Sequence, residues 1–188
     1  MWIIDKVVGE FDYGHNVWVQ NLDEVLSCGS EPKCLRQHGH RGKVIAYLTA
    51  DKGLISANSN MVIDFNDMKI MTKWIDSTLD HNYLIDINDP GCEDTFHHFW
   101  KEGVIDPAVL IWKEEGHWII NPDAYKDMSG HLYNKYRSFI ILPFVPTSEN
   151  LAKWMYDVMT DKMKSTGVKV HKIEWYETPK SRATYYGV

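Results

Sequence analysis

Two histidines separated by one glycine are the strongest chemical signal in the sequence. His38 and His40 precede the apolar run 44–48, which is typical of a β-strand. Side chains two residues apart on a strand point to the same face, so both imidazoles are expected to point together. His15 lies in another extended stretch, 11–17, in which alternate residues are aromatic or apolar. These three imidazoles are therefore candidates for one shared site.

The predicted site is a zinc centre of the catalytic kind. Three neutral imidazoles and one water form a tetrahedral zinc site with an open position, whereas structural sites are closed by four protein ligands. We therefore predict that His15, His38 and His40 bind Zn²⁺. Cys34 lies four residues before His38, which brings a thiol within reach of a substrate held on that metal.

The composition argues against several classes of function. With 188 residues, one domain is the default, and a formal net charge of −6 does not suit nucleic-acid binding, which depends on clustered Lys and Arg. No run approaches the roughly 18 apolar residues that span a bilayer, and the first residues lack the basic start of a signal peptide. Three irregularly spaced cysteines do not indicate a disulfide framework. We expect a cytoplasmic protein with free thiols and no nucleic-acid or membrane partner.

The first third of the chain is predicted to be mainly extended. Residues 2–19 are expected to form one long strand or a strand pair, and 41–51 the next strand, with a loop over 20–37 between them. Glycine, serine and asparagine predict turns at 52–53 and over 56–60.

A helix is expected after a short extended piece at 61–63. Asp64 or Asn66 is the predicted N-cap, and apolar residues at three- and four-residue steps indicate an amphipathic helix of about 14 residues. The helix runs into Asp80-His81.

The stretch from 88 to 142 is divided into short pieces by glycine and proline. Two apolar runs, 109–112 and 117–120, lie on either side of a plausible turn and predict a hairpin. The many aromatic residues of this stretch indicate that it packs rather than remaining disordered.

The last part of the chain is predicted to be a helix followed by a strand. Thr147 is the expected N-cap, with Glu149 in the first turn, and Gly167 is a natural end. The strand 168–178 places Glu177 on the same face as two large apolar residues. Helices on one face of an antiparallel sheet make an α+β domain.

Six motifs in a fixed order now resemble a known family. They are Phe11-Asp12-Tyr13-Gly14-His15, Cys34-x-x-x-His38-Gly39-His40, Met61-Val62-Ile63-Asp64-Phe65, Leu79-Asp80-His81, Pro146-Thr147-Ser148-Glu149-Asn150 and Glu177-Thr178. Together they are similar to the 6-pyruvoyl-tetrahydropterin synthase and 6-carboxytetrahydropterin synthase family. The resemblance covers about 1–88 and 143–188, so we expect a single domain over residues 1–188 with an insertion at about 89–142.

The resemblance implies a role for each motif. It implies that His15, His38 and His40 hold zinc, that Cys34 is the catalytic base or nucleophile, and that Asp80 and His81 assist proton transfer. It also implies that Glu177 binds the pterin ring and is a catalytic residue of the proton relay. The helix start at Thr147, Ser148 and Glu149 would meet the pterin edge. The implied fold is the tunnelling fold, an antiparallel sheet with two helices on one face. Its subunits join into a barrel, so we expect a homo-oligomer, a tetramer or hexamer, with active sites between subunits.

The spacing between Cys34 and His38 bears on the reaction. Three intervening residues resemble the bacterial carboxy-forming enzymes of the queuosine and 7-deazapurine route. This favours conversion of 7,8-dihydroneopterin triphosphate to 6-carboxy-5,6,7,8-tetrahydropterin, acetaldehyde and triphosphate. Two alternatives remain: a 6-pyruvoyl-tetrahydropterin synthase, and a non-catalytic homologue that only binds a pterin.

The other cysteines and histidines are interpreted as structural. This group consists of Cys28, Cys92, His97, His98, His117, His131 and His171.

Overall fold

The structure is a computed structural model that describes residues 2–50 and 60–187. The turns predicted at 52–53 and over 56–59 lie outside these residues. Asn60, the last residue of the second predicted turn, has a left-handed backbone with φ 52°.

The chain divides into two compact units. Unit 1 consists of Met1–Tyr13, His40–Asp80 and Thr147–Val188, and unit 2 of Gly14–Gly39 and His81–Pro146. The predicted insertion at 89–142 therefore falls inside unit 2.

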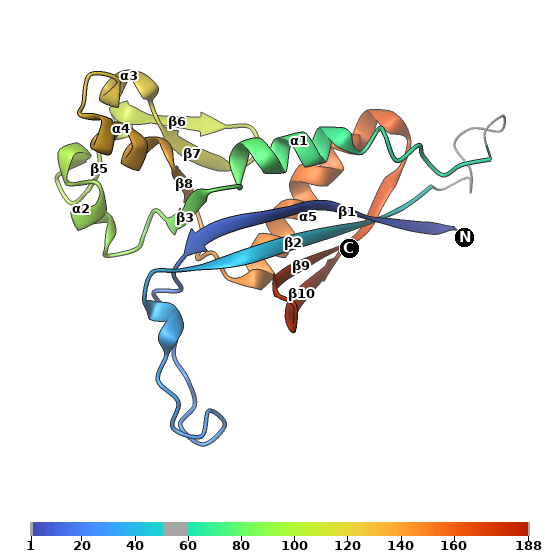
Figure 1. The fold of residues 1–188 in the computed structure, drawn as a ribbon, viewed down its shortest axis with the longest axis horizontal. Helices are drawn as coiled ribbons and strands as arrows, with labels where there is room; N and C mark the ends of the chain where they lie inside the picture. Colours follow the sequence, from blue (N-terminus) through green and yellow to red (C-terminus); the bar gives the residue numbers. More distant parts are fainter. Residues whose placement is uncertain (1, 51–59, 188) are drawn as a thin grey trace. The chain divides into compact units, whose positions relative to one another are not determined.

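The strands and helices follow one another along the chain as coloured in Figure 1. The strands are β1 (Ile3–His15), β2 (His38–Thr49), β3 (Asn82–Asp86), β4 (Trp100–Lys101), β5 (Val104–Ile105), β6 (Leu110–Lys113), β7 (His117–Ile120), β8 (Phe139–Leu142), β9 (Lys169–Thr178) and β10 (Ser181–Tyr186). The α-helices are α1 (Lys69–Thr78), α2 (Cys92–Thr95), α3 (Pro122–Tyr125), α4 (Gly130–Arg137) and α5 (Ser148–Met163). No helix in the described part of the chain is long and apolar enough to cross a bilayer.

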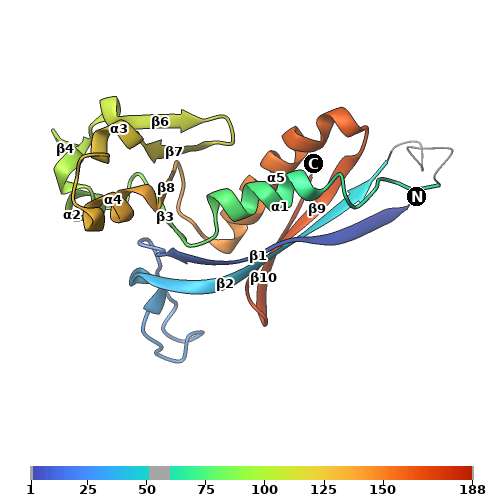
Figure 2. The same ribbon diagram turned by 45° about the horizontal axis from the view of Figure 1, so that its top comes forward.

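Unit 1 is a layer of strands with α1 and α5 on one face (Figures 1 and 2). Its strand order is β10-β9-β2-β1, and β9 pairs antiparallel with both of its neighbours. Alternate residues of β2 and β9 are fully buried, namely Val44, Ala46, Leu48, Ile173 and Trp175. Helix α1 contacts α5 through Trp74 and Trp154, whose ring centroids are 5.5 Å apart. The predicted α+β arrangement of helices on one face of a sheet is confirmed.

The two long helices differ in how well their starts were predicted. Thr147 caps α5 as expected, because its Oγ1 accepts a hydrogen bond from the backbone N–H of Asn150 at 3.3 Å. The predicted cap of α1 is wrong. Asp64 instead accepts from the N–H of Asn66 at 2.8 Å and closes a local turn, so that α1 begins only at Lys69 and has 10 residues.

Strand boundaries also depart from the sequence-based prediction. β2 begins at His38, three residues earlier than expected, and the predicted extended piece at 61–63 is reduced to an isolated bridge at Met61. β9 ends near Pro179 as predicted, but the chain turns there and adds β10. A proline ends a strand without preventing a hairpin, since it is a favoured turn residue.

Unit 2 consists of short elements around an aromatic core. The predicted hairpin is confirmed as β6–β7, with Gly116 at φ 85° in its turn. The core residues with the largest rings are Phe96, Phe99, Tyr125, Tyr136 and Phe139. This core explains how a stretch without long elements is ordered, because it buries its own apolar surface.

The sheet of unit 2 corrects the prediction of a purely antiparallel sheet. Its strand order is β3-β8-β7-β6, and β3 pairs parallel with β8, from Tyr83 opposite Phe139 to Asp86 opposite Leu142. Parallel neighbours need a long connection. The elements between β3 and β8 supply that connection, and they were not predicted in detail because each is too short to show a clear period.

Candidate metal centre

His15 and His38 lie at two strand ends, with their rings close together and tilted by 51°. His15 is the last residue of β1 and is fully buried, and His38 is the first residue of β2; their ring centroids are 4.6 Å apart. The Nδ1 of His15 lies 2.7 Å from the carbonyl oxygen of Pro146, and that of His38 lies 2.7 Å from the carbonyl oxygen of Arg36. A carbonyl only accepts, so each Nδ1 carries the hydrogen. Each neutral ring then has its lone pair on Nε2, which is the arrangement of a metal ligand.

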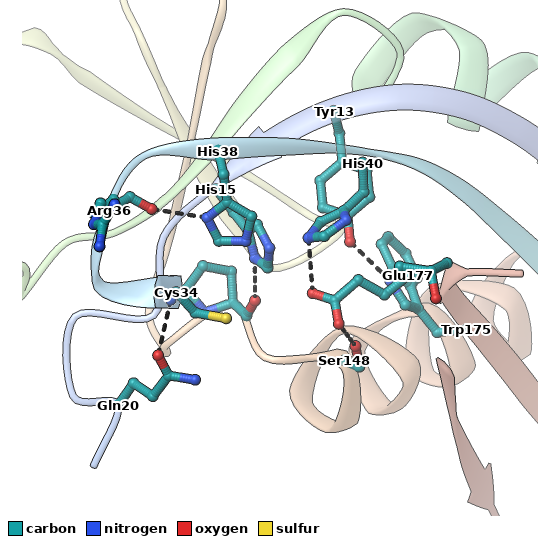
Figure 3. Close-up of polar contacts among 12 residues, drawn as sticks. Tyr13, His15, Gln20, Cys34, Arg36, His38, His40, Ser148, Trp175 and Glu177 are labelled. Carbon is teal, nitrogen blue, oxygen red and sulfur yellow. Dashed lines mark hydrogen bonds and ion pairs between the residues drawn. The ribbon is translucent and has the colours of Figure 1, made fainter. Parts of the chain in front are cut away.

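His40 lies two residues further along β2 and faces Glu177 of β9. Its Nε2 is 3.2 Å from Oε1 of Glu177, and the two side chains are 19% and 24% exposed. The other carboxylate oxygen of Glu177, Oε2, accepts a hydrogen bond from Oγ of Ser148 at 3.2 Å. Ser148 is the first residue of α5, so the helix start fixes the orientation of this carboxylate (Figure 3).

One ligand atom from each of His15, His38, His40 and Glu177 lies within 4.8 Å of the others. The two-residue spacing in β2 brings His38 and His40 to the same side of the strand, as Figure 3 shows. Three imidazole nitrogens and a carboxylate oxygen are donors that suit a zinc ion. The residues present therefore fit the predicted metal.

Aromatic residues lie beside His40. The ring of Tyr13 is 5.8 Å from that of His40, centroid to centroid, and its hydroxyl accepts a hydrogen bond from Nε1 of Trp175 at 3.3 Å. Burial raises the pKa of Tyr13 well above its usual range. Its hydroxyl therefore stays protonated and neutral at physiological pH.

Cys34 lies on a single turn of 3₁₀ helix, Lys33–Leu35, and is half-buried with a free thiol. Its backbone is held on both sides by residues that follow His15. The N–H of Cys34 donates to Oε1 of Gln20 at 2.8 Å, and its carbonyl oxygen accepts from the N–H of Val17 at 2.7 Å. The loop that carries the thiol is thus tied to the end of β1.

Asp80 and His81 are not among the four clustered ligands. Asp80 accepts a hydrogen bond from the backbone N–H of Asp12 at 3.0 Å. His81 is exposed and has a left-handed backbone with φ 59°, which is uncommon and costly for a residue with a side chain.

The predicted pterin-binding residues at the start of α5 have different surroundings. The hydroxyl of Thr147 is engaged in the helix cap, and that of Ser148 in the bond to Glu177. Glu149 is exposed in the first turn.

The closeness of Glu177 to His40 was missed by sequence reasoning, which placed this glutamate at the pterin ring and in the proton relay but not beside the metal ligands. The two residues are far apart in the sequence, and nothing in the spacing of either motif indicates that they meet. The alternation of β9 carries a partial signal, since Glu177 follows the buried Trp175 by two residues.

Comparison with known proteins identifies relatives along the whole chain. A family model described as 6-pyruvoyl tetrahydropterin synthase matches residues 5–188. The chain is 29% identical over 197 residues to 6-carboxy-5,6,7,8-tetrahydropterin synthase of Aquifex aeolicus, which covers 98% of this chain and 97% of that protein.

Solved structures share the fold. An uncharacterised protein from Wolinella succinogenes is 36% identical with a TM-score of 0.89, covering 100% of this chain and 98% of that one. The 6-pyruvoyl tetrahydropterin synthase of Caenorhabditis elegans is 20% identical with a TM-score of 0.54, covering 100% and 96%. These likenesses confirm the tunnelling fold class. Since the family model matches nearly every residue, the chain belongs to the 6-pyruvoyl tetrahydropterin synthase family.

Proposed function

We propose that the chain is a zinc-dependent 6-carboxy-5,6,7,8-tetrahydropterin synthase that acts on 7,8-dihydroneopterin triphosphate. The observation that carries the proposal is the group of His15, His38, His40 and Glu177, whose ligand atoms lie within 4.8 Å of one another. Similarity over the full length to a relative named for this activity supports the choice of product. The three-residue gap between Cys34 and His38 supports the same choice.

The three histidines are the proposed zinc ligands. His15 and His38 each use Nδ1–H for a backbone carbonyl, which orients the ring and leaves Nε2 for the metal. When bound, Zn²⁺ supplies a Lewis acid that polarises oxygen atoms of the substrate side chain.

Cys34 is the proposed general base. The reaction requires a proton to be removed from carbon next to a developing carbonyl, and a thiolate can accept that proton near neutral pH. The backbone bonds to Val17 and Gln20 hold the thiol in place before substrate arrives. Such preorganisation matters because a displaced base loses much of its effect.

Glu177 is the proposed acceptor for the pterin ring. A carboxylate has two oxygens that can accept the ring's adjacent N–H donors in a bidentate arrangement. Ser148 holds one of these oxygens and thereby sets the plane of the carboxylate. Thr147 and Glu149 complete the proposed pterin subsite at the N-terminus of α5, where backbone N–H groups face outward.

Asp80 and His81 are proposed to serve a neighbouring subunit. They lie outside the four-ligand group, and the His81 side chain is exposed, so a role in proton transfer is best met across an interface. This proposal predicts a homo-oligomer, a tetramer or hexamer, in which each site uses residues from more than one copy.

The test is to incubate the purified zinc-loaded protein with 7,8-dihydroneopterin triphosphate and identify all products by mass spectrometry. The proposed reaction releases acetaldehyde together with triphosphate. Release of triphosphate with the three-carbon side chain retained would assign the 6-pyruvoyl-forming reaction, which the name of the family model favours. Tight binding of the substrate without any product would identify a pterin-binding protein and overturn the enzymatic proposal.

A further inference from the structure

We propose that Asp86, the last residue of β3, and Asp89, three residues further on, are positioning residues for Cys34. They act through the 16–20 segment, the five residues that directly follow His15. The inference rests on the proposed role of Cys34 as the base. It gives a function to Asp89, the first residue of the 89–142 stretch.

The two carboxylates hold the 16–20 segment on one side. Oδ2 of Asp89 accepts a hydrogen bond from Nδ2 of Asn16 at 2.7 Å, and Oδ2 of Asp86 accepts from Nε1 of Trp18 at 3.0 Å. Asn16 is held from a second direction, since its Oδ1 accepts from the hydroxyl of Tyr83 at 3.0 Å. Alternate residues of the segment are therefore fixed by side chains of the β3 region.

Two other residues of the segment, Val17 and Gln20, hold Cys34. Val17 donates its N–H to the Cys34 carbonyl, and Gln20 accepts the Cys34 N–H. The segment thus connects the two aspartates to both backbone hydrogen-bonding groups of the proposed base. A shift of Asn16 or Trp18 would be passed to Cys34 through two bonds of 2.7 and 2.8 Å.

The burial of the aspartates supports a specific role. Asp86 is 3% exposed and Asp89 is 7% exposed, and a buried carboxylate is costly unless its oxygens accept hydrogen bonds. Both oxygens of each are used: Oδ1 of Asp89 accepts from the N–H of Gly91 at 2.7 Å, and Oδ1 of Asp86 accepts from the N–H of Asn88 at 3.0 Å. A carboxylate can close its own turn and hold the segment at once, whereas an amide offers one oxygen only.

Asp89→Asn is the first test, since it turns one acceptor into a donor that faces the Asn16 amide. We expect kcat for product formation to fall roughly tenfold with KM changed by less than about twofold, because the base is displaced while the pterin site is intact. Zinc content, measured by elemental analysis, should stay at the wild-type level.

Exchanging the side chains of Asn16 and Asp89 should restore the activity lost in Asp89→Asn. In the double variant Asn16→Asp with Asp89→Asn, the amide at 89 donates to the carboxylate at 16, and Tyr83 can still donate to position 16. We expect kcat to return to within about threefold of wild type. Asp106→Asn is the matched control, because Asp106 loses the same charge but caps Ala108 and pairs with Lys101 elsewhere in unit 2.

Alkylation by iodoacetamide gives a readout that does not depend on turnover. Peptide mass spectrometry follows each cysteine separately, and the Cys34 rate should rise about threefold or more in Asp89→Asn as the loop loosens. The exposed Cys28 should react at an unchanged rate. Burial, together with Asp89 and Asp86, raises the pKa of Cys92 to about 12, so this thiol should stay unreactive in folded protein.

The outcomes separate this inference from the proposed function. If the wild-type protein makes no product, the proposed function fails, and alkylation still tests whether the aspartates position Cys34. If Asp89→Asn matches Asp106→Asn in both kcat and Cys34 alkylation, the inference is overturned. Should Asp89→Asn not fold, Trp18→Phe removes the bond to Asp86 and leaves the bond between Asp89 and Asn16 in place. In this variant kcat should fall and the Cys34 alkylation rate should rise, each by about threefold. Wild-type values of both would again reject the inference.

Discussion

His40 and Glu177 are held by long regular elements, whereas His15, His38 and Cys34 are held by hydrogen bonds at strand ends and in a loop. β2 has 12 residues and β9 has 10, and each extends from the site in one direction, β2 after His40 and β9 before Glu177. By contrast, the Nδ1 of His15 depends on a carbonyl 131 residues away, and Cys34 depends on Val17 and Gln20.

Positions in paired strands and positions in loops should respond differently to mutation. In a paired strand, side-chain direction is set by backbone alternation, so a single neighbour can change with little effect on it. In a loop, each hydrogen bond restricts conformations that are otherwise accessible, and its loss releases them. We therefore expect remote substitutions to act on Cys34 far more than on Glu177.

The largest expected effect is that of His38→Ala. Loss of one imidazole should weaken zinc binding by at least about 100-fold and remove turnover with it. Elemental analysis after dialysis measures the metal directly. His131→Ala, which changes an exposed histidine of α4, is the control and should retain zinc. Full zinc occupancy in His38→Ala would remove this residue from the metal site.

Cys34→Ala should reduce kcat by about 1,000-fold, because it removes the proposed base. Zinc content should be unchanged, because Cys34 is not one of the proposed metal ligands. This result would distinguish the role of the thiol from that of the histidines. Cys28→Ser, at an exposed thiol, is the control for general effects of cysteine loss. A Cys34→Ala variant with wild-type turnover would exclude the thiol from the reaction.

Glu177→Gln sharpens the contrast by changing a residue held by regular structure. It keeps the shape of the side chain but removes the charge, so KM should rise and kcat fall together, lowering kcat/KM about 10- to 100-fold. Retained zinc would assign Glu177 to the pterin ring. Loss of zinc would instead make it a fourth metal ligand and contradict the proposed role. Glu114→Gln, at an exposed turn residue, is the control.

Mixing two inactive variants tests whether His81 acts on a neighbouring copy. Cys34→Ala and His81→Ala should each be inactive alone. After unfolding and refolding together, random assembly leaves both residues intact in about one quarter of the sites, so activity should return to about a quarter of wild type. No recovery in assembled mixed oligomers would place Cys34 and His81 in the same subunit.

The smallest effect is predicted for His117 of β7, which is not one of the clustered ligands. Burial, reinforced by Lys113 and opposed by Glu115, lowers its pKa to about 4. Between about pH 6.5 and 4, His117 is protonated in the unfolded chain but stays neutral in the folded chain. The free energy of unfolding therefore falls as the pH falls. His117→Phe should remove on the order of 1–3 kcal/mol of this pH dependence, measured by urea unfolding of metal-free protein. An identical pH dependence in both proteins would contradict the assignment.

Much of the candidate site was predictable because its signals are local. The two-residue spacing of His38 and His40 and the alternation that ends at His15 follow from strand geometry alone. The N-cap at Thr147 could also be predicted, since capping involves residues three apart in the sequence. The start of α1 was not, because Asp64 favours a turn or a helix cap by the same chemistry, and only the packed chain selects one.

From the amino-acid order alone, three histidines could be predicted as candidate metal ligands on strands, with His38 and His40 on the same side of theirs. Three features could be seen only in the folded chain: Glu177 meets His40, β3 and β8 run parallel, and Asp86 and Asp89 hold the segment that is hydrogen-bonded to Cys34. The physical reason is that direction along a helix or strand is fixed by covalent geometry over a few residues. Contacts between distant segments depend instead on packing and on the hydrogen bonds that buried polar groups must find.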